Sequence, residues 1–316
     1  MKELVSYLNA RFPGKEAFQI LRRLIYHPVP AKTHRERIVF NHIKNNVTVR
    51  EAMLKDRQNF PGWLAVKWAK WVGNKSIMID LVKGEESAVL WAVEVGDKDI
   101  MKSKITSERA AFLWAVNVGD EEEMAGKIES GDTSYQLAKE IQSLKTCKPV
   151  IDILAGKVQT EPVAYQWLSK IGHDERMMSL IQSEDYAQML ARERKELAPA
   201  LIGKIFSSRT AYMWALEVGN RDVMIGKINS EETALLWAMN IGDRELMESK
   251  IVSERWAVRW ATEFGSTTAM ASKVKSEEMA LEWAINVGDW DVMVSKIRSN
   301  KIKALWNDLV RKDFEV

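Results

Sequence analysis

Apolar and polar residues follow a pattern in this chain that recurs every 23 residues. Each period contains an alanine, a Trp-Ala pair, a Gly-Asp pair, a methionine, a lysine before isoleucine or valine, and a serine. The tryptophans that mark the period are Trp68, Trp91, Trp114, Trp214, Trp237, Trp260, Trp283 and Trp306. Such a fixed period is typical of repeat proteins, in which each repeat buries its apolar face against its neighbours.

Residues 277–299 show how one repeat is predicted to fold. In residues 277–287, apolar positions spaced three, four and seven apart predict one face of an α-helix. Gly288 supplies the left-handed position that ends this helix, and Asp289 is expected to cap a second one. Ser299 precedes the next repeat, as serine does in several others, where a glutamate then suits the helix N-terminus. Each repeat is therefore predicted to be two short helices joined by a Gly-Asp turn.

Helices this short are marginal alone, because isolated helices below about 12 to 15 residues rarely persist in water. We therefore predict an all-α protein, an α-solenoid of about ten stacked two-helix repeats. Residues 1–62 lack the period and are predicted to form a basic, non-repeat helical N-terminal module that caps the array. Residues 63–316 form the predicted short-repeat α-solenoid, and its C-terminal end is capped by the polar residues 301–316.

The period is irregular near residues 137–200. Leu137 and Leu190 stand where tryptophan is expected, and seven extra residues lie around 145–149. The Gly-Asp turn is missing from residues 192–199. We expect these repeats either to diverge without functional consequence, which we favour, or to bend the array or present a longer loop.

Composition and charge fit a cytoplasmic protein. No segment reaches the roughly 20 uninterrupted apolar residues of a membrane helix, and the first residues lack a signal peptide's apolar run. The single cysteine, Cys147, cannot form an internal disulfide. The net charge is +2, but residues 1–62 hold 12 Lys and Arg against 5 Asp and Glu. The N-terminal module is therefore basic, and the array is mildly acidic.

The segment from Ala234 to Met247 resembles the helix-turn-helix part of an ankyrin repeat, and the likeness recurs in most repeats between Trp68 and Trp306. The repeat is some ten residues shorter than an ankyrin repeat and lacks the β-turn finger. The resemblance implies stacked helical pairs and a protein partner. Short HEAT-like or leucine-rich-variant solenoids are alternative architectures.

The tryptophans of the period share a helical stripe with alanine and valine, which favours core packing over a base-stacking surface. Four other tryptophans lie off this stripe, and we expect them to be partly exposed contact residues. They are Trp63, Trp71, Trp256 and Trp290.

A lysine recurs at one position of eight repeats, directly before isoleucine or valine. These residues are Lys104, Lys127, Lys157, Lys204, Lys227, Lys250, Lys273 and Lys296. We favour a structural role at helix ends, with the glutamate of the next helix as partner. The alternative is a continuous basic edge that binds phosphate or an acidic protein.

The residue before each of these lysines is always serine or glycine, and Ser179 holds the same place in a repeat that lacks the lysine. The position points away from the predicted core, where a solvent-facing residue has no reason to stay small. We therefore expect a neighbouring helix to approach it closely. A ligand backbone lying against this Ser/Gly row is the alternative.

The N-terminal module offers a second candidate binding surface. Its basic residues around a proline-containing segment are Arg22, Arg23, Lys32, His34, Arg35 and Arg37. The histidines lack a matching acidic or cysteine constellation, so we expect no catalytic residues and no metal site there.

We therefore predict a non-enzymatic interaction protein, a scaffold, adaptor or inhibitor that binds another macromolecule, which we expect to be a protein. The alternative is nucleic-acid binding through the lysine edge and the N-terminal module. No cofactor and no membrane partner are expected, and the oligomeric state is left open.

Overall fold

The computed structural model describes residues 2–12, 19, 32–142 and 148–314. Every regular element in these ranges is a helix, and they contain no strand, which confirms the predicted all-α class. The chain divides into an N-terminal part, Met1–Met177, and a C-terminal part, Met178–Val316. The predicted boundary of the N-terminal module at residue 62 stays a prediction.

The N-terminal part begins with helices that lie outside the 23-residue period. They are α1 (Lys2–Arg11), α3 (Lys32–Asn45), α4 (Val47–Lys55) and the 3₁₀-helix η1 (Arg57–Asn59). Asn46 caps α4, since its side-chain oxygen accepts a hydrogen bond from the backbone N–H of Val49 at 3.2 Å. These helices lead directly into α5.

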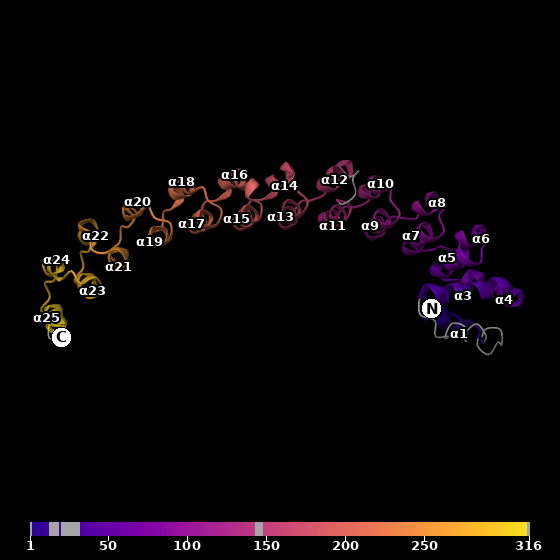
Figure 1. Cartoon of the computed structure of the whole chain (residues 1–316), viewed down its shortest axis with the longest axis horizontal. Helices are drawn as coiled ribbons and strands as arrows, with labels where there is room; N and C mark the ends of the chain where they lie inside the picture. The colour runs from indigo at the N-terminus through magenta and orange to yellow at the C-terminus, as the bar shows by residue number, and fades with distance from the viewer. Residues whose placement is uncertain (1, 13–18, 20–31, 143–147, 315–316) are drawn as a thin grey trace. The chain divides into compact units, whose positions relative to one another are not determined.

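Two-helix repeats follow in the rest of the N-terminal part. The longer first helices are α5 (Gly62–Trp71), α7 (Glu85–Glu94), α9 (Glu108–Asn117), α11 (Gly131–Ile141) and α13 (Glu161–Lys170). The shorter second helices are α6 (Lys75–Ile79), α8 (Lys98–Lys102), α10 (Glu121–Gly126) and α12 (Lys148–Ala155), and α14 (Glu175–Leu180) contains the division between the two parts. Within this part, α5 packs against α7, α7 against α9, α9 against α11, and α11 against α13 (Figure 1).

The C-terminal part repeats this arrangement. Its first helices are α15 (Glu184–Glu193), α17 (Ser208–Glu217), α19 (Glu231–Asn240), α21 (Glu254–Phe264), α23 (Glu277–Val287) and α25 (Asn300–Phe314). Between them lie η2 (Lys195–Leu197), α16 (Ala198–Leu201), η3 (Ile202–Lys204), α18 (Arg221–Met224), η4 (Ile225–Lys227), α20 (Arg244–Glu248), α22 (Thr268–Lys273) and α24 (Trp290–Val294). Figure 1 shows α17, α19, α21 and α23 side by side in one row, with the second helices in another.

The tryptophans of the period form the core of both parts. Trp68, Trp91, Trp114, Trp167, Trp214, Trp237, Trp260 and Trp283 are at most 2% exposed. Leu137 and Leu190 are buried at the corresponding positions of the irregular repeats. The core interpretation of the tryptophans is confirmed, and Trp306 is also buried, on α25.

The turn between the two helices of a repeat uses two left-handed residues. Gly96 has φ 99° and Asp97 has φ 54°, so the glycine is used as predicted. The predicted role of the following acidic residue is wrong, because no side-chain cap bond is made by Asp97 or Asp289. In two repeats the aspartate instead accepts from the buried indole, as between Trp237 Nε1 and Asp243 Oδ2 at 3.3 Å.

The irregular stretch is only partly described. The insertion around residues 145–149 falls largely outside the described residues, and α12 begins at Lys148. Where the Gly-Asp turn is lost, η2 follows α15 after a single residue, Arg194, and leads straight into α16. Of the alternatives for the irregular repeats, a longer loop is therefore wrong for this stretch, since a 3₁₀ turn makes the connection.

Candidate interaction surface

The lysines of the predicted edge are all half-buried, and most turn their ammonium groups onto the preceding repeat. Lys104 donates to the carbonyl oxygen of Val82 at 2.6 Å, and Lys250 donates to that of Ile228 at 2.6 Å. The same bond to the carbonyl 22 residues earlier is made by Lys127, Lys227, Lys273 and Lys296. These ammonium groups satisfy carbonyls at the ends of helices, which is a structural role.

Two of the eight lysines differ from the others. Lys157 and Lys204 lie in or beside the irregular stretch and make no such bond within the described ranges. Where the next helix begins with a glutamate, as with Glu108 after Lys104, we expected that carboxylate to be the lysine's partner, but it binds the following repeat instead. The acceptor is a backbone carbonyl because the lysine reaches back to the preceding repeat.

Replacing Lys250 with methionine is expected to lower the free energy of unfolding by about 1 kcal/mol. Methionine keeps most of the aliphatic stem but removes the donor to Ile228. Urea denaturation measures the change, and Lys275→Met at an exposed lysine is the matched control. Equal losses in the two variants would contradict a structural role for Lys250.

The glutamates that open the first helices make a second contact between neighbouring repeats. Glu85 accepts from the backbone N–H groups of Thr106 at 2.6 Å and Ser107 at 2.8 Å, and from the Ser107 hydroxyl. We call these Glu–Ser contacts. The other pairs are Glu108 with Ser130, Glu184 with Ser207, Glu231 with Ser253, Glu254 with Ser276, and Glu277 with Ser299. Each one places a carboxylate at the N-terminus of the next first helix.

These contacts favour the ionised carboxylate. The hydrogen bonds from Ser107 and Thr106 lower the pKa of Glu85 to about 2. Partial burial alone would raise the pKa of Glu231, but the hydrogen bonds from Ser253 and Val252 outweigh it and lower that pKa too. The Glu–Ser contacts therefore depend on negative charge.

The Ser/Gly row beside the lysines lies in the open. Its members are exposed: Ser103, Gly126, Gly156, Ser179, Gly203, Gly226, Ser249, Ser272 and Ser295. A Cβ added to Gly126, Gly203 or Gly226 would meet nothing within 4 Å. The expectation that a neighbouring helix approaches this row is therefore wrong at these three glycines. At Gly156 the Arg176 side chain of α14 would lie 3.7 Å from such a Cβ.

The four tryptophans off the stripe are half-buried, which confirms that they are partly exposed. Trp63 and Trp71 lie on α5. The guanidinium of Arg259 lies 5.0 Å from the ring centre of Trp256, and the Trp290 ring packs edge-on against Trp306 at 5.0 Å. Their role as partner contacts stays a prediction.

The basic residues of the N-terminal module are described only in part. Arg22 and Arg23 lie outside the described residues, as does the side chain of Lys32. His34 and Arg37 are exposed on α3, and Arg35 is half-buried there. Among the described residues, no group of three His, Cys, Asp or Glu side chains is placed to hold a metal ion.

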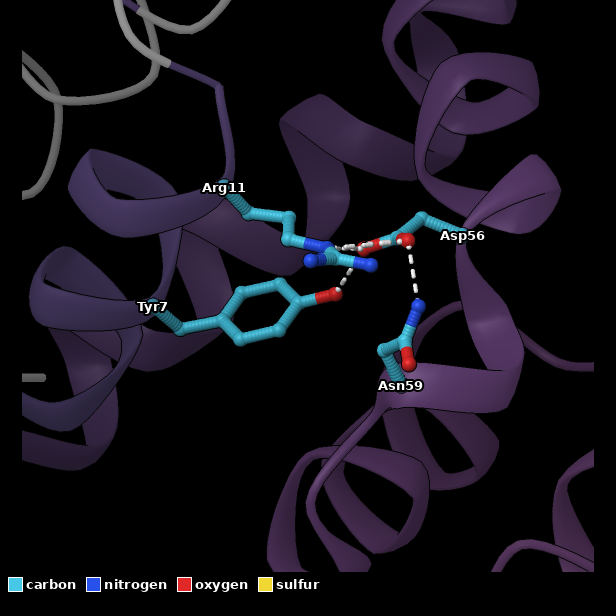
Figure 2. Close-up of polar contacts among 4 residues, drawn as sticks. All are labelled: Tyr7, Arg11, Asp56 and Asn59. Atoms are coloured by element: carbon cyan, nitrogen blue, oxygen red, sulfur yellow. Dashed lines mark hydrogen bonds and ion pairs between the residues drawn. The ribbon is translucent and has the colours of Figure 1, made fainter.

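A polar cluster attaches α1 to the end of α4 (Figure 2). Asp56 accepts from the Tyr7 hydroxyl at 2.9 Å, from Arg11 Nε at 3.0 and 3.1 Å, and from Asn59 Nδ2 at 2.7 Å. The hydrogen bond from Arg11 is the main cause of the lowered pKa of Asp56. Since all three partners converge on one carboxylate, this cluster holds the first helix in place.

A second ion-pair cluster joins α3 to the repeats. Lys67 on α5 lies 3.3 Å from Glu36 Oε2 and 3.1 Å from Glu94 Oε1, and Lys70 also pairs with Glu94. Burial acts to raise the pKa of Glu94, but the two lysines outweigh it and lower the pKa. Both lysines are thus committed within the N-terminal part.

Apolar side chains recur on the outer face of the first helices, two residues after the buried tryptophan. We call them the outer row: Val93, Val116, Leu216, Met239 and Ile285. They are between 42% and 53% exposed. On α19, Leu236 lies three residues before Met239 on the same helical face and is also exposed. The second helices carry a comparable set of exposed apolar residues at one repeated position: Ile77, Ile100, Val223, Leu246 and Val292. The outer row differs from this set because a further exposed apolar side chain, Leu236, extends it along α19.

A groove of about 540 Å³ lies between α17 and α19 in the C-terminal part. Its apolar lining comes from Tyr212, Met213 and Leu236. Its polar lining comes from Ser207, Ser208, Arg209, Asn229, Ser230, Glu232 and Thr233. Met213 precedes Leu216 by three residues, so the apolar side of the groove continues into the outer row.

Sequence reasoning missed both the outer row and the groove. The outer row had a visible signal, because an apolar residue recurs at a position that lies off the buried stripe. At the groove, Ser208 stands where most other repeats have glutamate. The sequence shows this change, but its consequence becomes visible only once the Glu–Ser contacts of the other repeats are known.

No protein-family model matches the chain, and comparison with curated proteins and with solved structures gave no match. In the described part of the chain, no helix is long and apolar enough to cross a membrane.

Proposed function

We propose that this chain is a non-enzymatic, cytoplasmic scaffold of ankyrin-like helical pairs, stacked as an α-solenoid, that binds another protein. The 23-residue period, the buried tryptophans and the successive packing of first helices support the architecture. The polar bonds between repeats, 22 residues apart on both the lysine and the glutamate side, support a regular stack.

The outer row is the observation that carries the proposed activity. Val93 and Ile285 are each 53% exposed, although valine and isoleucine are among the residues most often fully buried in proteins. Neighbouring first helices carry these residues within each part, Val93 and Val116 in the N-terminal part and Leu216 and Met239 in the C-terminal part. Each such patch gains free energy when a partner covers it. A protein partner fits such a surface better than a nucleic acid, whose binding is dominated by phosphate contacts.

The lysine contacts do not favour the nucleic-acid alternative. Six of the eight edge lysines donate to carbonyl oxygens of their own chain. An ammonium that leaves such a carbonyl to reach a phosphate gives up one charge-assisted bond for another. The net gain from phosphate binding is therefore small at these positions.

Affinity capture with a matched pair of variants tests the proposal. The outer-row variant carries Val93→Gln, Val116→Gln, Leu216→Gln and Met239→Gln. The control carries glutamine at equally exposed apolar positions of the second helices: Ile100, Val223, Leu246 and Val292. Quantitative mass spectrometry of lysate from the native host measures recovery.

We expect the wild type and the control to recover the same protein, and the outer-row variant to recover at least about ten-fold less. A ten-fold loss corresponds to about 1.4 kcal/mol, which the removal of a few apolar contacts readily supplies. Reproducible recovery of no protein, or equal recovery by both variants, would count against the proposal.

A further inference from the structure

One junction between first helices lacks the Glu–Ser contact and opens a groove in its place. At the N-terminus of α17, Ser208 occupies the position that Glu85 holds in α7 and Glu231 holds in α19. Its hydroxyl bonds to the Asn229 side chain and accepts from the Asn229 backbone N–H at 2.8 Å. Among the described residues no carboxylate accepts from the backbone N–H of Ser230, the N-cap of α19.

A comparison with another repeat shows that the loss of glutamate does not always leave space. Gly131 stands at the same position of α11, but the backbone of α13's repeat closes over it. A Cβ built on Gly131 would lie 3.4 Å from Val158 Cα. Between α17 and α19, by contrast, the groove of about 540 Å³ remains.

Two positive features lie beside Ser230 in the groove. Arg209 is exposed on the groove wall, and no ion pair within the described ranges engages it. The α19 N-terminus adds the positive end of a helix dipole. Glu232 also lines the groove and opposes an anion, so anion binding requires that Arg209 and the helix dipole outweigh it.

We propose, on the basis of the proposed function, that this groove binds an acidic residue of the partner protein. The partner's carboxylate takes the place of the missing glutamate beside Ser230 and Arg209. An apolar side chain next to it in the partner packs against Tyr212, Met213 and Leu236.

Two observations indicate that the occupant is a carboxylate flanked by an apolar side chain of the partner. Six other junctions place a glutamate carboxylate on the corresponding serine, so the local geometry suits a planar carboxylate. The apolar groove wall meets the outer row, which is where the partner is proposed to lie. A phosphate group would gain little from that wall.

A pair of short peptides tests the site on the full chain. The probes are the fluorescein-labelled, amidated peptides Leu-Glu-Leu-Leu and Leu-Gln-Leu-Leu, which differ only in charge, and fluorescence anisotropy measures binding. We expect the Glu peptide to bind at least about ten-fold more tightly than the Gln peptide. We expect Arg209→Gln to weaken Glu-peptide binding several-fold and Glu232→Gln to strengthen it.

The variant Ser208→Glu supplies the missing carboxylate from within the chain. It is expected to abolish Glu-peptide binding while its thermal midpoint equals or exceeds that of the wild type. Ser249→Glu, at an exposed position of α20's repeat, adds the same charge away from the groove and should leave binding unchanged.

The site would be overturned by equal binding of the two peptides, by unchanged binding to Ser208→Glu, or by a groove that takes inorganic phosphate and rejects the Glu peptide. These results leave the proposed function standing if the outer-row variant still loses the captured protein. Loss of the site and loss of the proposed function are therefore separate outcomes.

Discussion

Replacing Trp237 with alanine is expected to lower the free energy of unfolding of the C-terminal part by about 3 to 5 kcal/mol. Trp237 is fully buried on α19, which packs against both α17 and α21. The substitution removes apolar contacts on both sides and leaves a cavity. It also removes the indole donor to Asp243. For a domain with a total stability of about 5 to 15 kcal/mol, this is a large fraction.

Trp256→Ala on α21 is the control for this prediction. Trp256 is half-buried and stacks with Arg259, so its removal is expected to cost clearly less than that of Trp237. Urea denaturation followed by far-ultraviolet circular dichroism compares the variants, because helical backbone amides dominate this signal. Similar midpoints for the two variants would show that the tryptophans of the period are not the main core.

Acidification is expected to destabilise the protein by breaking the Glu–Ser contacts together. The pKa values of Glu85, Glu108, Glu184, Glu231 and Glu254 are all lowered, with that of Glu85 at about 2. A lowered pKa in the folded state means that the unfolded chain binds more protons in the window between the two values. The stability is therefore fully present above about pH 4.5 and is lost as the pH falls towards 2.

The expected loss in the free energy of unfolding is only about 1 kcal/mol for each contact. It is this small because the carboxylates are partly exposed and solvent screens their charge. Several contacts of this size add to a large effect when they act in series along the chain. Thermal midpoints measured at intervals between pH 6 and pH 2.5 follow the loss.

A matched pair of variants assigns this acid sensitivity. The double variant Glu85→Gln and Glu108→Gln should lower stability at neutral pH and flatten its dependence on pH. The control, Glu86→Gln and Glu122→Gln, changes exposed glutamates that make no Glu–Ser contact. If the control flattened the pH dependence as much, the contacts would not be its source.

The period of the sequence predicted the helices and their core because burial leaves a direct trace in residue type. Tryptophan and alanine at helical spacing identified the buried stripe, and Gly96 and its equivalents identified the turns. Leu137 and Leu190 keep the buried stripe apolar where tryptophan is missing, so the irregular repeats also retain their core.

The polar contacts between repeats could not be predicted from one repeat. The partners of Lys250 and Glu231 are backbone groups 22 residues away, and backbone acceptors have no signature in the sequence. The Ser/Gly row led to a wrong prediction of a close neighbouring helix for the same reason. A small residue such as Gly226 or Ser249 does not show whether another helix covers the outer side of its own helix.

The differential capture of a partner tests the central claim, that the outer row binds protein while the edge lysines hold the repeats together. A third arm carries Lys227→Met, Lys250→Met and Lys273→Met. We expect this lysine variant to be less stable but still to recover the partner at a temperature where it is folded, whereas the outer-row variant is stable and loses the partner. Recovery by the outer-row variant together with loss in the folded lysine variant would contradict the account.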